Sequence, residues 1–433
     1  MKRILILLAV VVLYACSKGN GELIGVQGRE EWYQPDPFGM LFIPMGSYNM
    51  GPSDQDVPYS LTAQTRTVSV QAFYMDQTEI SNNEYRQFVY WVRDSMARRI
   101  MAEEVDEEEF SIAENEYGEE IDPPLLDWYA KLKWDEPEAR EALEPMFYTP
   151  AERFYRRREL DARKLMYEYY WIDYRRAAKR DSRDSEDHAF SMDRSKFIMR
   201  DVINVYPDTL AWIHDLTYSF NEPMTKNYFW HPAYDDYPVV GVSWKQATAF
   251  CIWRTQLLES FLIGNGSAIV NDFRLPTESE WEWAARGGLD LSPYPWGGPY
   301  IRNSRGCFLG NFKPMRGNYI DDGGFHTVKI NSYNPNDFGL YCMAGNVAEW
   351  TSNAFDESAY NFAHDLNPDY VYDAKENDPP SLKRKVIRGG SWKDVGYYLQ
   401  TSTRTYEYQD TAKCYIGFRC VMTYLGRSKA DNL

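Results

Sequence analysis

The fold is decided by the stretch Arg274-Leu275-Pro276-Thr277-Glu278-Ser279-Glu280-Trp281-Glu282-Trp283-Ala284-Ala285-Arg286-Gly287-Gly288. Thr277 and Glu280 form a capping box, in which each side chain accepts a hydrogen bond from the backbone of the other residue. Two consecutive glycines then supply the left-handed conformation that ends many helices. We predict a short helix between them. Its three glutamates, at positions 278, 280 and 282, are expected to complement the helix dipole.

Three further motifs follow in the chain: Gly345-Asn346-Val347-Ala348-Glu349-Trp350-Thr351, Arg388-Gly389-Gly390-Ser391-Trp392 and Gly417-Phe418-Arg419-Cys420. In this order, the four motifs resemble the signatures of the sulfatase-modifying factor family, to which the formylglycine-generating enzymes belong. With residues 40–92, the resemblance covers most of the chain outside a charged insertion. It implies an α+β, formylglycine-generating-enzyme-like fold, related to C-type lectins, with little regular secondary structure.

Local patterns predict several elements of this domain, which we place at residues 38–94 and 226–433. Strands are expected at 41–44, 67–70 and 73–75, with a turn at 45–47. A helix should start at Ser81, where Glu84 completes a capping box and apolar residues follow at helical spacing. Ser243 and Gln246 start another in the same way. Beyond residue 289, Gly, Pro, Asn and aromatic residues predict a region shaped by loop packing.

The amino end has the pattern of an export signal. Lys2 and Arg3 precede ten apolar residues, too few to span a membrane as a helix, and Ala15-Cys16 follows. The site resembles the lipobox of bacterial lipoproteins. We expect a signal peptide at 1–15, lipidation of Cys16 and a tether at 16–37, which would anchor the protein in the outer membrane, facing the periplasm. The alternative is an ordinary signal peptide with an incidental cysteine.

Residues 95–225 form the charged, aromatic-rich insertion. Eleven acidic and no basic side chains lie between 103 and 122, whereas residues 153–183 contain eleven basic and five acidic ones. We expect the acidic block to lack regular structure in part, and the basic block to form long helices. Arg and aromatic residues often anchor interfaces, so we assign an interface to Arg156, Arg157, Arg158, Tyr169, Tyr170 and Trp171. Solvated surfaces, or pairing of the two blocks within one chain, are the alternatives.

The family resemblance implies a copper(I) site formed by two cysteines after the Gly-Gly-Ser-aromatic motif. Copper(I) selects soft thiolate ligands. The residues between Trp392 and Arg404 include no cysteine, and Asp394 stands near the first of the two positions. Cys414 lies ten residues beyond Arg404, which we take as too far to replace a ligand. We therefore expect no enzymatic activity and no required cofactor.

The resemblance also implies a structural disulfide between Cys251 and Cys420. The remaining cysteines of the mature chain, at positions 307, 342 and 414, are then expected to be free buried thiols.

Two structural calcium sites are implied by the same resemblance. One would use Gly345, Val347 and Glu349, with Cys342 in the place of a polar ligand. The other would use Asn311, the Phe312 carbonyl, Asp322 and a carbonyl near Gly324. The alternative is that these residues only hold turns.

Composition excludes other classes of protein. The net charge of −17 argues against nucleic-acid binding, which needs clustered cations. The five histidines contain no i, i+4 pair, there is no Cys-x-x-Cys motif, and there is no glycine-rich phosphate loop, so neither a zinc centre nor a nucleotide site of these kinds is expected.

Residues 21–28, 73–80 and 206–210 make a further resemblance, to the Por/Gld lipoproteins of the type IX secretion and gliding motility machinery. That resemblance implies a non-catalytic, lipid-anchored subunit whose copies form a periplasmic ring with a secretion protein N partner. A trans-envelope motor and an outer-membrane protein are further expected partners. The alternatives are a ligand-binding, lectin-like lipoprotein and, more remotely, a formylglycine-generating-type oxidase.

Overall fold

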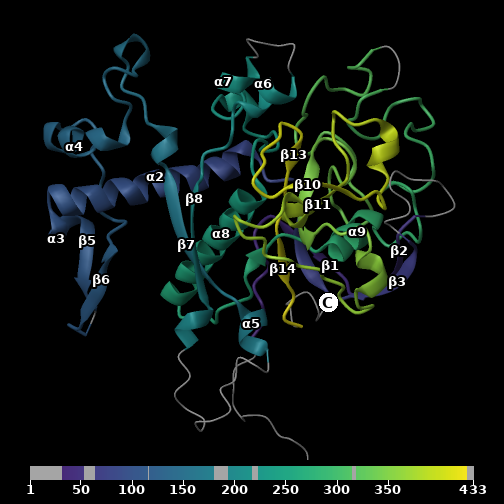
Figure 1. Ribbon diagram of the computed structural model, residues 1–433, viewed down its shortest axis with the longest axis horizontal. Coiled ribbons are helices and arrows are strands. Elements are labelled where there is room, and N and C mark those ends of the chain that lie inside the picture. The colour runs from purple at the N-terminus through teal and green to yellow at the C-terminus, as the bar shows by residue number, and fades with distance from the viewer. Residues whose placement is uncertain are drawn as a thin grey trace, which may run out of the picture. The chain divides into compact units, whose positions relative to one another are not determined.

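The computed structural model describes residues 32–52, 64–115, 117–179, 194–216, 223–314 and 318–426. Residues Asp36–Gly426 belong to one unit (Figure 1). The predicted signal peptide, Cys16 and most of the tether lie outside the described residues. In the part of the chain that is described, no helix has the length and apolar character needed to cross a membrane.

Two four-stranded sheets bring the sequence motifs together. The first has the antiparallel order β1 (Met40–Ile43), β4 (Phe73–Asp76), β14 (Val421–Thr423), β9 (Phe273–Arg274). The second has the order β12 (Thr405–Tyr408), β11 (Arg384–Arg388), β10 (Ala348–Ala354), β13 (Ile416–Gly417), and only β10 and β13 run parallel. Each of the four motifs therefore contributes residues to a sheet.

The predicted strands near the amino end are confirmed, but the predicted turn at 45–47 is wrong. Gly46 and Ser47 begin β2 (Gly46–Met50), which pairs with β3 (Arg66–Val70). A β-carbon on Gly46 would lie 2.5 Å from the Trp283 ring. The glycine therefore permits close packing of this strand on the motif helix.

Three capped helices have the predicted starts. They are α2 (Asn82–Glu104), α8 (Trp244–Gly264) and α9 (Glu278–Arg286), and all three capping boxes are formed. Gly287 ends α9 with φ of 61°. Tyr85 of α2 stacks on Phe250 of α8 with ring centroids 5.6 Å apart. These contacts hold α2 and α8 against each other.

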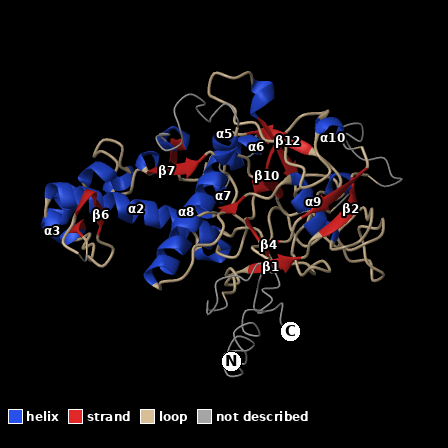
Figure 2. Ribbon diagram, turned by 90° about the horizontal axis from the view of Figure 1, so that it is seen from below, coloured by secondary structure: helices blue, strands red, loops and turns tan. Residues whose placement is uncertain are grey.

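Trp281 of α9 is fully buried in the main core, among side chains from β1, β2, β3, β4 and β14. The chain between α9 and β10 contains no helix or strand among its described residues, as we predicted for this region. Loops make up much of the part around α9 and β10 (Figure 2). Side chains such as Asn336, which hydrogen-bonds four backbone groups, hold these loops.

The insertion does not consist of long helices, so that prediction is wrong. The basic block instead contains β7 (Met166–Ile172), which pairs along its whole length with β8 (Ile198–Asn204). The acidic block forms α3 (Glu107–Phe110) and the hairpin of β5 (Ser111–Glu114) and β6 (Glu120–Leu126). Helix α2 runs past the predicted boundary at 94, and its second half packs with Phe110 and Met146 in a separate small core.

The remaining elements are short. The helices are α4 (Pro137–Ala142), α5 (Tyr174–Ala178), α6 (Ala211–Asp215), α7 (Met224–Asn227) and α10 (Ala359–Phe362). The 3-10 turns are η2 (Glu144–Met146), η3 (Phe154–Arg156), η4 (Ala162–Lys164), η6 (Arg194–Phe197), η7 (Pro232–Tyr234), η8 (Pro380–Lys383) and η9 (Gly396–Leu399).

Candidate functional site

The loop after Trp392 is where the resemblance expects two thiolates. Here it folds into the turn η9, and Asp394 accepts hydrogen bonds from the Ser391 amide at 2.9 Å and from the Ser391 hydroxyl at 2.7 Å. Burial raises the pKa of the Asp394 carboxyl. Asp394 thus closes the turn 391–394 that precedes η9. The loop offers copper(I) none of the soft ligands that it prefers.

Cys414 lies closer to this loop than we expected from the sequence. The Trp392 indole nitrogen donates to the Cys414 carbonyl at 3.2 Å, because β13 folds back beside the loop. The thiol is buried, and burial, together with nearby Asp215, raises its pKa. A protonated, single thiol at this position is a poor nucleophile and a poor metal ligand.

Helix α6, which comes from the end of the insertion, covers the same region. Trp212 stacks on Trp392 with ring centroids 6.2 Å apart and planes 16° apart. Asp215 accepts a hydrogen bond from the Cys414 amide at 2.9 Å. The insertion therefore packs directly on the residues that border the former thiolate position.

The two cysteines of the predicted disulfide lie next to each other. The sulfur atoms of Cys251 and Cys420 are 3.5 Å apart in the buried core, with both residues as thiols. Burial and the neighbouring Cys251 raise the pKa of Cys420. Their covalent link stays a prediction. Cys342 and Cys414 are buried as expected, but the prediction is wrong for Cys307, which lies exposed in a loop.

Residues of one predicted calcium site do come together. Asp322 accepts hydrogen bonds from the Phe312 amide at 2.7 Å and from the Gly324 amide at 3.3 Å. The side-chain oxygen of Asn311 is buried and has no hydrogen-bond partner among the described residues. It lies 3.2 Å from the position that a β-carbon on Gly324 would take. Burial raises the pKa of Asp322, which an adjacent cation would counteract. An unsatisfied oxygen beside a buried carboxylate fits calcium, which binds oxygen ligands.

The other predicted calcium site fits a cation less well. The Glu349 carboxylate already accepts hydrogen bonds from the Trp281 indole at 2.7 Å and from Arg419 at 2.6 Å. Cys342 presents a sulfur, which is a poor ligand for this hard ion. Glu79, which the sequence did not single out, lies here too and accepts from the Asn346 side chain at 2.6 Å. Burial and Glu349 raise the pKa of Glu79 well above its ordinary value.

The three glutamates of α9 do more than complement a helix dipole. All three are buried and paired with arginines: Glu278 with Arg404 at 2.5 Å, Glu280 with Arg274 at 2.6 Å, and Glu282 with Arg286 at 2.7 Å. Arg388 also contacts Glu282. Burial alone would raise the pKa of Glu278, but Arg404 and Arg388 bring it below its ordinary value. We call these ion pairs the buried arginine network.

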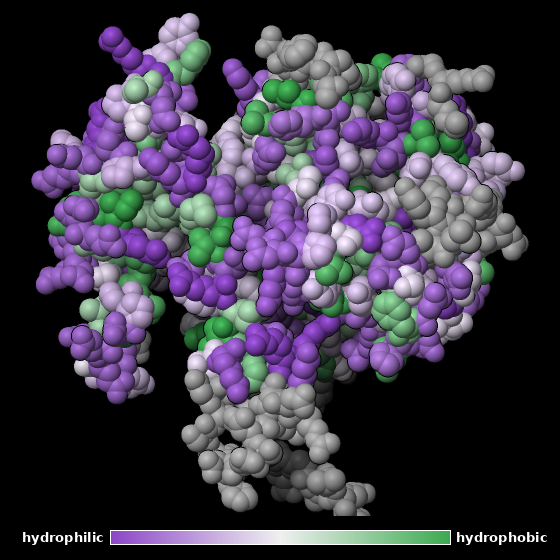
Figure 3. All heavy atoms as spheres, viewed as in Figure 1, coloured by the Kyte–Doolittle hydropathy of each residue, from purple (hydrophilic) through white to green (hydrophobic). Residues whose placement is uncertain are grey.

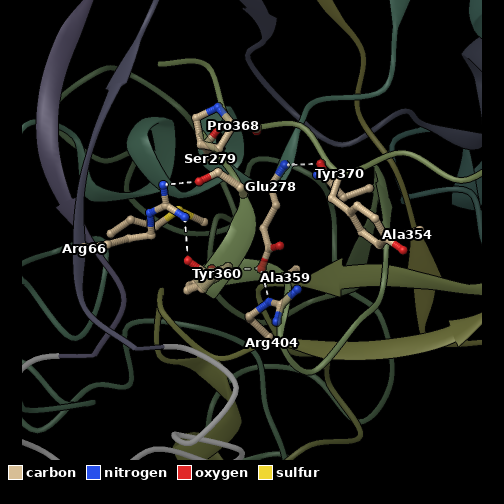
Figure 4. A pocket seen from close by; sticks show the side chains of 12 residues that line it. Arg66, Glu278, Ser279, Ala354, Ala359, Tyr360, Pro368, Tyr370 and Arg404 are labelled. Carbon is tan, nitrogen blue, oxygen red and sulfur yellow. Dashed lines mark hydrogen bonds and ion pairs between the residues drawn. The ribbon is translucent and has the colours of Figure 1, made fainter. Parts of the chain in front are cut away.

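Figure 4 shows the small cavity beside this network, with Glu278, Tyr360 and Arg404 pointing toward one another. Its volume is about 20 Å³, which is room for about one water molecule. Such a cavity cannot admit a peptide, so the part of the network around Glu278 and Arg404 is structural and does not line a substrate cleft.

A larger groove lies between the β7 and β8 hairpin and α8, which are side by side in Figure 1. Its volume is about 590 Å³, and Tyr169, Tyr170 and Trp171 of the predicted interface all line it. Tyr169 is buried, whereas Tyr170 is 51% exposed. The hairpin is attached to α8 through Tyr167, whose hydroxyl donates to Gln256 at 2.8 Å.

The three arginines of the predicted interface have different surroundings. Arg158 lies 3.2 Å from Glu144 and over the ring of Phe147, so it stabilises its own subunit. Arg156 and Arg157 are exposed. No ion pair between described residues joins the acidic block to the basic block. The arginines and lysines of the basic block that form ion pairs do so instead with acidic residues between positions 144 and 173 and with Asp369.

Comparison with known proteins identifies the fold family. Residues 30–424 match the model of the sulfatase-modifying factor enzyme 1-like domain. The chain belongs to the sulfatase-modifying factor family. It is 35% identical over 192 residues to inactive C-alpha-formylglycine-generating enzyme 2 of Bos taurus, which covers 43% of this chain and 50% of that protein. It is 32% identical over 197 residues to formylglycine-generating enzyme of Bos taurus, covering 44% and 45%.

The chain thus spans about half of the length of the curated relatives it matches. Among solved structures, PvdO from Pseudomonas aeruginosa aligns over 89% of this chain and 94% of that one, with 14% identity and a TM-score of 0.46. The sulfatase-modifying factor family includes both enzymes and members named as inactive. Membership of this family is therefore compatible with a non-catalytic role, and whether this chain is catalytic depends on the residues at its site.

Proposed function

We propose that this chain is a non-catalytic, lipid-anchored structural subunit of the type IX secretion and gliding motility machinery. In this proposal, acylated Cys16 holds it in the outer membrane on the periplasmic side. Copies form a ring together with a secretion protein N partner, and the ring connects an outer-membrane protein to the trans-envelope motor.

One observation carries the non-catalytic part of the proposal. The loop after Trp392 has no cysteine, and Trp212 and Asp215 of α6 pack against its neighbours Trp392 and Cys414. The buried arginine network around α9 is nevertheless complete. A chain that keeps the scaffold of the family but lacks the two thiolates fits a protein that is used for its shape.

We also propose that Asn311 and Asp322 hold a structural calcium ion, which would add positive charge beside a buried carboxylate and fix the loops around it. Addition of calcium to chelator-treated protein should raise the unfolding temperature. In Asp322→Asn the same addition should have no effect, and an equal response in both would place the ion elsewhere.

The experiment that tests the assembly part is isolation of the tagged, full-length chain from detergent-solubilised outer membranes, followed by identification of the associated proteins. The proposal predicts that the secretion protein N partner is recovered in a constant ratio. The matched control is a tagged lipoprotein of unrelated fold from the same membrane. Recovery of the chain with no secretion component would contradict the proposal.

A further inference from the structure

The groove between the hairpin and α8 has aromatic walls and unpaired acids, and we call it the aromatic-acidic groove. Its volume of about 590 Å³ is within the range of ligand-binding cavities, about 300–1,000 Å³. Tyr170, Trp171, Tyr174 and Trp244 present rings to it. Most of the face shown in Figure 3 is hydrophilic, with hydrophobic residues in small separate groups.

The charge of this groove is negative. Its two basic residues are neutralised by acids, Lys245 by Asp410 at 2.7 Å and Arg274 by Glu280 at 2.6 Å. Four carboxylates line it without an ion-pair partner among the described residues, namely Asp201, Glu259, Asp272 and Asp373. Burial raises the pKa of Glu259 and of Asp272. The charge of a positively charged occupant would offset the cost of this desolvation and favour the ionised carboxylates.

A turn elsewhere in the chain has the complementary chemistry. Phe154 and Tyr155 are 66% and 80% exposed, and among the described residues the only ring–ring contact of each is with the other. Arg156 and Arg157 follow, and within the described residues neither has an ion-pair partner. Tyr155 and Arg156 have φ of 48° and 57°. This left-handed backbone is costly for residues with side chains, and it turns four large side chains outward.

We propose that the turn Phe154–Arg157 of one copy of this chain inserts into the aromatic-acidic groove of a second copy. Guanidinium groups bind well both to carboxylates and to the faces of aromatic rings. The turn does not line the groove of its own chain. Each copy therefore carries one free turn and one free groove.

Such a contact joins two different surfaces, so it repeats from copy to copy and closes into a ring or continues as a filament. The inference deepens the proposed function, on which it rests for the ring geometry, by naming the contact between neighbours.

A charge exchange between turn and groove tests it on the full-length chain in detergent. The turn variant carries Arg156→Glu and Arg157→Glu, and the groove variant carries Glu259→Lys and Asp272→Lys. The control variant carries Lys131→Glu and Lys226→Glu. It has the same change in net charge as the turn variant, but at exposed residues elsewhere in the chain. Native mass is measured for each, and urea unfolding verifies that each is folded.

We expect the wild type and the control variant to form large assemblies, and each charge variant alone to dissociate at least tenfold more readily. A mixture of the two charge variants should assemble again, because each turn then meets a groove of opposite charge. Assembly of either charge variant alone at wild-type strength would refute the contact while leaving the proposed function intact. Failure of the mixture to assemble would show that turn and groove do not meet. A wild type that stays monomeric would overturn the contact between copies, whereas the proposed function is tested by the isolation of the chain with its secretion partner.

Discussion

Replacement of Glu282 by Gln removes one charge from the centre of the buried arginine network. Both carboxylate oxygens of Glu282 are in use: one accepts from Arg286 at 2.7 Å and from the Gly51 amide at 2.8 Å, and the other accepts from Arg388. The side chains of Glu282 and Arg388 have no exposed surface, and that of Arg286 is 1% exposed. Two guanidinium groups would therefore lose a counter-ion in a place that water does not reach.

The expected cost follows from this burial. Removal of one partner from a buried ion pair costs about 3–5 kcal/mol, because a charge is left without compensation. Native domains are stable by only about 5–15 kcal/mol. The Gln amide would also point a donor at a guanidinium, so we expect the upper part of the range.

Urea unfolding of wild type and variant at neutral pH measures the difference. Glu357→Gln is the matched control, because Glu357 pairs with Arg384 at 2.8 Å but is 57% exposed. An exposed pair contributes about 0–1 kcal/mol. If Glu282→Gln lowers the free energy of unfolding by no more than Glu357→Gln does, the network does not stabilise the fold and our account of the α9 motif is wrong.

Three further predictions follow from the structure and the sequence. Non-reducing peptide mapping of oxidised protein should find Cys251 linked to Cys420. The two cysteines are 169 positions apart, so the chain-entropy model predicts that the disulfide stabilises the fold by about 5 kcal/mol. Alkylation of both thiols in folded protein would refute the link. The raised pKa of Glu79 means that the folded state binds the proton of this carboxyl more tightly than the unfolded chain does. The stability of the wild type should therefore fall relative to that of Glu79→Gln as the pH rises above 4.5, the ordinary pKa of the group. Parallel pH profiles of the two proteins in urea unfolding would contradict this. Cys16→Ala should release the protein from membranes or stall its processing, because stable anchoring needs the acyl chains, and normal fractionation of this variant with the outer membrane would disprove lipidation.

The elements that the sequence predicted well are those with local signals. Each capping box joins residues three apart, and those at Ser81, Ser243 and Thr277 are all formed. Gly287 ends α9 because its own backbone adopts the left-handed conformation, with φ of 61°. Such signals do not depend on distant parts of the chain, and the ordered motifs placed them in one family.

The role of the α9 glutamates could not be predicted because two of their partners, Arg388 and Arg404, are far away in the chain. Arg388 is 106 residues from Glu282, and Arg404 is 126 residues from Glu278. Only the fold brings these groups together. A helix pattern alone leaves a glutamate on the first turn as an ordinary partner of the dipole.

The insertion contained a local signal for a strand that our interpretation did not use. In β7, Tyr167 and Tyr169 are buried and alternate with more exposed neighbours, which is the period of a strand. Tyr and Trp also favour strands. The aromatic residues that interleave with the basic ones led to a helical interpretation, and none of the arginines of the block lies in β7. The aromatic-acidic groove depends on this hairpin, so it was not predictable from a helical interpretation.

The most direct test of the central claim is the amount of type IX cargo that a strain lacking this chain releases into the medium, with formylglycine in the strain's own sulfatases measured as the reference. We predict that cargo secretion stops and returns with the wild-type chain, while formylglycine is unchanged. Normal secretion with loss of formylglycine would contradict the account, since it would mean that the chain is an oxidase and not a part of the secretion apparatus.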